Sequence, residues 1–237
     1  MENMLEMMGV SSNLVESMSE MDPTAMLNQM YFTIMSLLPI LLFIIFAGNA
    51  LVVDQVDKGS MAYILSTPTK RSAVVITQAI FMIVAPFIMV GCAFITKLIA
   101  CSAFIGEVDV AKYAALYGGL YLPTEAMASI CYLASCIFNL SKYALGLGGG
   151  LNVWFFICSL LGMFGSEDMV NMGMGVEELG MFNRLSLVGL FDINALGTVG
   201  SGDVDYAFVP KLIALVVVAI ACYVIGAIRF QKKDLPL

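Results

Sequence analysis

The stretch MYFTIMSLLPILLFIIFAGNALVV, residues 30–53, decides the fold class of this chain. It carries no charged side chain and is longer than the roughly 20 apolar residues that a helix needs to cross a bilayer. Four further runs of this kind follow, at residues 74–98, 113–138, 145–164 and 206–228. None alternates strictly between apolar and polar residues, as a membrane-spanning β-strand would. We therefore expect an all-α polytopic membrane protein with about five transmembrane helices in a single domain, residues 1–237.

The composition supports this fold class and narrows the function. Hydrophobic residues make up 60% and charged residues 12% of the chain, against roughly 45–50% and 25% in soluble domains. Among the five predicted spans, the run at residues 113–138 has the weakest support, because Pro123 and Glu125 interrupt its apolar sequence near the middle. The six cysteines form no CxxC pair and the chain has no histidine, which argues against a zinc site or a disulfide framework. No set of nucleophile, base and orienting acid is visible, so we expect no enzyme activity in this chain.

The basic residues indicate an orientation, because cytoplasmic loops are enriched in Lys and Arg. With five spans and the C-terminus in the cytoplasm, the inner basic residues are Lys58, Lys70, Arg71, Lys142, Arg229, Lys232 and Lys233, and the outer ones are Lys97, Lys112, Arg184 and Lys211. We therefore expect a multi-pass protein of a bacterial cell membrane, with loop 54–73 inside and segments 1–29 and 165–205 outside. The net charge of −7 lies mostly on the outer side, and a nucleic-acid partner would need a basic patch instead.

Three features of the spans and the outer loop are candidates for function. Glu125 lies at membrane depth, where an ionisable group costs at least about 2.5 kcal/mol, so it either lines a substrate pathway or faces water or a neighbouring helix's hydroxyl. Gly146 and Gly150 are four residues apart and predict a close helix contact. Loop 165–205 is long and periodic, which predicts one or two short external helices that lie at the outer leaflet or dip into it as re-entrant segments.

Loop 54–73 has the features of a short amphipathic helix at the membrane surface. Asp57 and Lys58 end the first span, Gly59 permits a sharp turn, and Ser60 can cap the helix that follows. Apolar residues then recur at helical spacing, and they are Met61, Ala62, Ile64 and Leu65. Pro68 follows and disfavours helix at the residue before it. The segment either connects two spans or docks a soluble partner.

Four stretches together resemble the permeases of the ABC-2 type of ABC exporter. They are AGNALVVDQVDKGSMAYILSTPTKRSAVVITQ (47–78), CYLASCIFN (131–139), FNRLSLVGLFD (182–192) and RFQKKDLPL (229–237). The resemblance covers essentially the whole chain in order. It implies a permease that works as a homodimer, or as a heterodimer with a related permease, in contact with membrane lipid.

The resemblance also implies a coupling helix at residues 59–68, which inserts into a cleft of a separate cytoplasmic ABC ATPase subunit. The residues expected to couple the two subunits are Asp57, Lys58, Gly59, Ser60, Met61, Tyr63, Ile64, Leu65 and Pro68. The chain contains no G-x-x-x-x-G-K-[ST] motif, so ATP and Mg are expected on the partner ATPase and no cofactor on this chain. In the family, the region corresponding to loop 165–205 forms an external gate.

Members of this family usually have six spans, and the start of this chain resembles the external loop that follows the first of them. A truncated chain is therefore expected rather than a natural five-span permease. The function expected is ATP-driven export of a hydrophobic or amphipathic substrate. The alternative is a membrane protein that uses no ATPase, such as a secondary transporter or an immunity factor.

Overall fold

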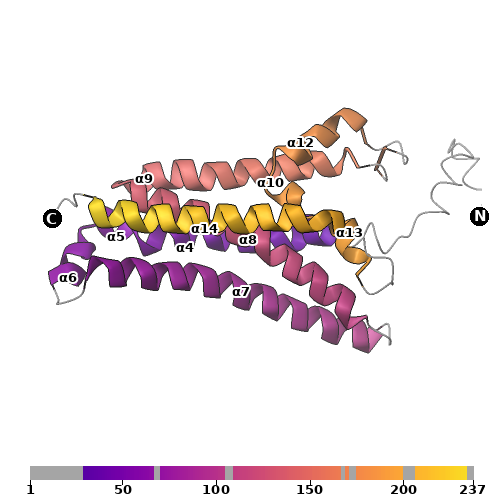
Figure 1. Cartoon of the computed structure of the whole chain (residues 1–237), viewed down its shortest axis with the longest axis horizontal. Helices are drawn as coiled ribbons and strands as arrows, with labels where there is room; N and C mark the ends of the chain where they lie inside the picture. Colours follow the sequence, from indigo (N-terminus) through magenta and orange to yellow (C-terminus); the bar gives the residue numbers. More distant parts are fainter. Residues whose placement is uncertain are drawn as a thin grey trace, which may run out of the picture.

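A computed structural model of the chain describes residues 29–66, 70–104, 109–166, 169–170, 175–199 and 206–233. The long helices lie side by side along one axis, with the C-terminal end of the last helix beside α6 at one end of the bundle and α12 and α13 at the other (Figure 1). These two ends are called the α6 end and the α13 end below. Apart from Gln29, the expected external segment 1–29 lies outside the described residues.

Five helical stretches are long and apolar enough to cross a membrane, as the sequence predicts. The first joins η1 (Tyr31–Ser36), α4 (Leu37–Leu51) and α5 (Val53–Asp57), and the second and third are α7 (Arg71–Phe104) and α8 (Val110–Ile137). The fourth joins α9 (Ser141–Ala144), η2 (Leu145–Gly149) and α10 (Gly150–Met163), and the fifth is α14 (Val209–Lys232). The all-α polytopic class is thus confirmed, and α8 continues as one helix through Pro123.

Helix α8 lies at the centre of the bundle and is the most buried of the five spans. Its mean hydropathy is lower than that of the other four spans. The reason is structural, because its polar side chains and carbonyls form hydrogen bonds with neighbouring helices instead of facing lipid. Side-chain hydrogen bonds join it to α4, α7, α10 and α14: Ser135 Oγ to Gly48 O, Tyr132 Oη to Val75 O, Asn152 Nδ2 to Met127 O and Tyr223 Oη to Glu125 Oε1. Such bonds hold membrane helices together where lipid is as apolar as the side chains.

Small residues let the neighbouring backbones approach α8, but not the pair that the sequence predicts. A Cβ built on Gly148 would lie 3.0 Å from Ala134 Cβ and 3.2 Å from Cys131 Cα, whereas Gly146 and Gly150 face open space. The predicted Gly146–Gly150 contact is therefore wrong within this chain. The reason is local geometry: residues 145–149 form a wide π-helical turn, which changes the face that this segment turns toward α8.

The described part of loop 165–205 folds back into the α13 end through short helices. They are η3 (Glu177–Leu179), α12 (Gly180–Arg184), η4 (Val188–Leu190) and α13 (Ile193–Gly197). Buried Ser186 donates a hydrogen bond to the carbonyl of Phe155 at 2.7 Å. Phe155 lies roughly 12 Å along the helix axis from the end of α10 at Met163, since a helix rises about 1.5 Å per residue. The segment therefore re-enters the bundle, as expected for loop 165–205.

The re-entrant segment rests on Gly119 of α8, which yields a matched pair of substitutions. A Cβ on Gly119 would lie 2.5 Å from Leu196 Cδ1 and 2.9 Å from Phe191 Cε2, whereas the neighbouring Gly118 faces open space. Gly119→Ala should lower the free energy of unfolding by about 1–3 kcal/mol through overpacking. Gly118→Ala should be neutral or stabilise the helix by up to about 1 kcal/mol. Thermal unfolding of both purified variants tests this, and equal effects would rule out the contact.

Candidate functional site

The short helix predicted within residues 59–68 is present as α6 (Ser60–Ser66), and a glycine turn separates it from α5. Its coupling role stays a prediction. Gly59 adopts φ = 72°, a left-handed conformation that costs other residues roughly 1–2 kcal/mol. Its N–H donates to the carbonyl of Val56 at 3.1 Å. Ser60 Oγ donates to the carbonyl of Gln55 at 3.2 Å. Ser60 therefore serves the end of the preceding helix, and capping of α6 by its side chain stays a prediction.

The described side chains of α6 point in two directions. Met61 is 2% exposed and belongs to the hydrophobic core, so it anchors α6 to the bundle. Tyr63 is 81% exposed and projects away from the chain. The side chains of Ile64 and Leu65, and all of Pro68, lie outside the described residues.

Asp57 connects the end of α5 to the fourth span. Its Oδ2 accepts a hydrogen bond from the backbone N–H of Ser141, the first residue of α9, at 3.0 Å. Asn49 of α4 donates to the Oγ of the same Ser141 at 2.6 Å. An aspartate from another helix thus satisfies a free N–H at the start of α9.

Lys58 pairs locally and faces solvent. Its Nζ lies 2.8 Å from Asp54 Oδ2, one helical turn earlier. This hydrogen bond and the charge of Asp54 raise the pKa of Lys58, so the ammonium stays charged at neutral pH. An exposed pair of this kind contributes little to stability.

Lys233, directly after α14, connects this helix to the carboxyl end of α8 at the α6 end of the bundle. Its Nζ donates to the carbonyls of Cys136 and Phe138 at the carboxyl end of α8, where a positive charge is favoured. Burial lowers the pKa of Lys233 to about 8, so the group is mostly protonated at neutral pH. Arg71, at the start of α7, donates to the carbonyl of Lys233 at 3.3 Å. The end of α8 and the turn that follows it are therefore held from several helices.

Glu125 lies near the middle of α8 and is 7% exposed. Its Oε1 accepts a hydrogen bond from the Tyr223 hydroxyl of α14 at 2.7 Å, and among the described residues its buried Oε2 has no hydrogen-bond partner. Tyr121, one turn earlier, donates to the carbonyl of Ile83 at 3.2 Å, and its hydroxyl also interacts with the Glu125 carboxyl. The sequence left open whether Glu125 lines a pathway or faces a neighbouring hydroxyl. The structure gives it such a hydroxyl, and the pathway role stays a prediction.

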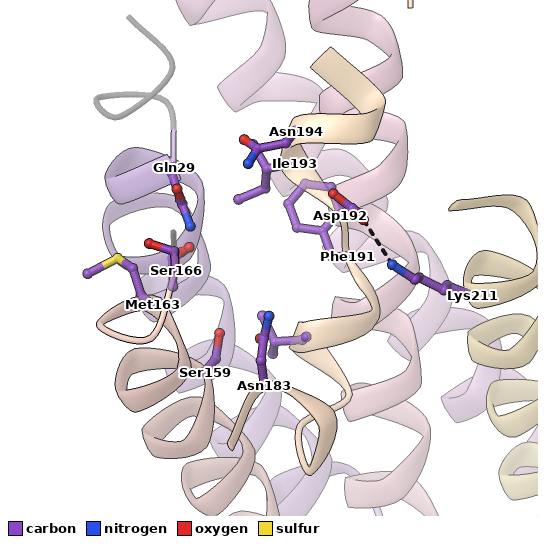
Figure 2. A pocket seen from close by; sticks show the side chains of 13 residues that line it. Gln29, Ser159, Met163, Ser166, Asn183, Phe191, Asp192, Ile193, Asn194 and Lys211 are labelled. Carbon is purple, nitrogen blue, oxygen red and sulfur yellow. Dashed lines mark hydrogen bonds and ion pairs between the residues drawn. The ribbon is translucent and has the colours of Figure 1, made fainter. Parts of the chain in front are cut away.

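A polar cavity of about 190 Å³ opens at the α13 end between the start of the first span, α10, the re-entrant segment and α14 (Figure 2). Asp192 lies on its wall, caps α13 by accepting from the N–H of Ala195, and pairs with Lys211 at 2.9 Å. Burial opposes ionisation of this carboxyl, but the Lys211 hydrogen bond and the Ala195 N–H hold its pKa below the usual value. The other polar residues on the wall include Ser159, Ser166, Asn183 and Asn194. The cavity lies in the region expected to form an external gate, which stays a prediction.

The sequence did not point to the partners of these residues. Ser141 follows a short turn, which is typical of a helix start, but nothing local connects it with Asp57. Tyr223 is a polar aromatic residue within an apolar span, a weak signal of an internal hydrogen bond. Lys211 was read only as an outer basic residue. Each partner lies far along the chain from the residue that it serves, so only the packing brings them together.

The five apolar helices and the exposed short helix at one end define a multi-pass membrane protein of the permease type. The family model for ABC-2 family transporter proteins matches residues 4–235, and the chain belongs to this family. It is therefore the membrane subunit of an ABC transporter and associates with ABC ATPase subunits rather than being the ATPase itself. No curated protein and no solved structure matches the chain.

Asp57 and Asp54 provide a test of the link between α5 and α9. Asp57→Ala removes the acceptor of the Ser141 N–H and should lower the free energy of unfolding by about 0.5–2 kcal/mol, as loss of a helix cap does. It should also speed amide exchange at residues 141–144. Asp54→Ala loses only the exposed pair with Lys58 and should leave the free energy of unfolding and this exchange nearly unchanged. Hydrogen exchange of both purified variants decides, and unchanged exchange in Asp57→Ala would contradict the link.

Glu125 can be tested apart from its hydrogen bond to α14. Tyr223→Phe should lower the free energy of unfolding by about 1–3 kcal/mol, because it leaves a buried acceptor unpaired. Glu125→Gln keeps an acceptor for Tyr223 and should cost less. If the carboxyl lines a pathway, Glu125→Gln should nevertheless reduce efflux of a hydrophobic dye from cells that express the permease with its ATPase. Unchanged efflux would eliminate the pathway role.

Proposed function

We propose that this chain is the permease subunit of an ATP-driven exporter and that α6 is its coupling helix. The observation that carries the proposal is the display of α6 beyond a left-handed glycine, anchored by buried Met61 with Tyr63 81% exposed. A short helix that presents an aromatic side chain away from its own chain is suited to insertion into a groove of a partner. In the proposal, that groove belongs to a separate ABC ATPase, which binds ATP and Mg.

The contacts of the α6 end suggest how movement of α6 reaches the spans. Asp57 of α5 accepts a hydrogen bond from the Ser141 N–H at the start of the fourth span, and Asn49 of α4 donates one to the Ser141 hydroxyl. Closure of the ATPase pair would therefore displace α5 and the fourth span together. We infer that this shifts the bundle between inward-open and outward-open or closed states and extrudes a hydrophobic or amphipathic substrate.

The charge distribution supports a cytoplasmic α6 end. Described basic residues gather there, and they are Lys58, Lys70, Arg71, Lys142, Arg229, Lys232 and Lys233. Under the positive-inside rule this supports the proposal that the C-terminus lies in the cytoplasm of a bacterial cell. The permease is proposed to act as a dimer, with a second copy or a related permease.

Tyr63 and Tyr206 give a matched test of coupling. Both are exposed, at 81% and 71%, and Tyr206 begins η5 (Tyr206–Phe208), directly before α14 at the α13 end. Tyr63→Asp should reduce co-purification of an ABC ATPase encoded beside the permease by tenfold or more, because an aromatic anchor is replaced by a charge. Tyr206→Asp should leave the complex intact. Equal recovery of the ATPase with both variants would overturn the proposal.

Gly59 provides a second variant of the same coupling segment. Proline cannot reach φ = 72°, so Gly59→Pro should misorient α6 and abolish co-purification, while the spans stay folded. Leu65→Asp should act in the same way if its side chain enters the ATPase groove. Circular dichroism and size-exclusion chromatography of each variant exclude simple misfolding. Export without any bound ATPase would favour a secondary transporter instead, and the absence of both export and a bound ATPase would favour an immunity factor.

A further inference from the structure

A groove lined by basic residues lies at the α6 end between the carboxyl ends of α8 and α14. It has a volume of about 490 Å³ and is lined by Cys136, Ile137, Ile225, Ile228, Arg229, Lys232 and Lys233. No acidic residue is among these, and the described part of the chain gives neither Arg229 nor Lys232 a salt-bridge partner. Asp234, which follows Lys233 in the sequence, lies outside the described residues.

The groove has a charged part and an apolar part. Arg229 and Lys232 are three residues apart on α14, so their side chains leave the same face. Ile228 and Ile225 continue that face toward the middle of the span, and Ile137 faces them from α8. These three isoleucines are each close to half exposed. Two cations thus lie at the level of the helix ends, with an apolar wall on their membrane side.

Lys233 has a different role from the other two cations. Its ammonium is committed to the carbonyls of Cys136 and Phe138 and so closes the floor of the groove. The aspartates of the neighbouring α5 are also in use, since Asp54 pairs with Lys58 and Asp57 holds the Ser141 N–H. Arg229 and Lys232 therefore remain available for an anion.

We propose that this groove binds the phosphate headgroup of an anionic lipid, with an acyl chain along the isoleucines. Snorkelling alone would explain two basic residues at the end of a span. It does not explain a concave site that puts them over an apolar wall shared by two helices. Basic pockets between transmembrane helices are suited to anionic headgroups. This site is independent of α6 and of ATP coupling.

The test uses the purified full-length chain in a neutral detergent, titrated with phosphatidylglycerol and followed by native mass spectrometry. Arg229→Gln/Lys232→Gln should weaken binding roughly 10- to 30-fold, because each surface cation contributes measurably to anionic lipid binding. Lys112→Gln/Arg184→Gln removes two cations near the α13 end and should leave binding unchanged. The charge-keeping variant Arg229→Lys/Lys232→Arg should retain it, which separates charge from a loss of folding.

Competition identifies the source of the phosphate. Inorganic phosphate at millimolar concentration should not displace phosphatidylglycerol, because it lacks the acyl chain that the isoleucines hold. Displacement by inorganic phosphate would overturn the lipid assignment in favour of a soluble anion. Equal lipid binding by the Gln variant and the unmodified chain would overturn the site altogether. A change of oligomeric state without a change in lipid binding would assign the groove to contact with a second copy.

Discussion

Polar groups at membrane depth must find partners within the protein, and in this chain α8 provides most of them. In lipid, helices gain little from hydrophobic contact with one another, so close packing and a few hydrogen bonds decide which surfaces meet. Ser135, Tyr132 and Glu125 of α8 each bond a different neighbour, and Asn152 bonds the α8 carbonyl of Met127. The most polar span is therefore the central one.

The same helix organises the two ends of the molecule. At the α13 end, Gly119 accepts the re-entrant segment, whose Asp192 is fixed by Lys211. At the α6 end, Lys233 holds the last carbonyls of α8, and the turn after α8 leads to Ser141, which α4 and α5 hold. A displacement of α5 would therefore also move the start of the fourth span, because the Asp57–Ser141 hydrogen bond joins the two. This physical continuity gives the proposed coupling a route that does not depend on flexibility.

Much of the fold could be predicted from the sequence, and less of the site. All five spans, the glycine turn at Gly59 and the short helix after it follow from hydropathy and local spacing, which are properties of neighbouring residues. The predictions that paired distant elements were weaker. The glycines that meet α8 include Gly148 rather than Gly146 and Gly150, because a π-helical turn changes the face of that segment. The bond from the Ser60 hydroxyl back to Gln55 of the preceding helix could not be read from the sequence either, since both helix ends lie within a few residues of Ser60.

By itself, the sequence determined that this protein is a bundle of membrane-spanning helices, with basic residues at one end and a short helix between its first two spans. These features depend on composition and on 3.6-residue periodicity, which a single stretch contains. Only the tertiary structure decided that α8 is central, that Glu125 meets Tyr223 and that Asp57 meets Ser141. Those pairings depend on how each helix is rotated about its axis. In lipid that rotation is selected by a few small residues and hydrogen bonds contributed from distant parts of the chain.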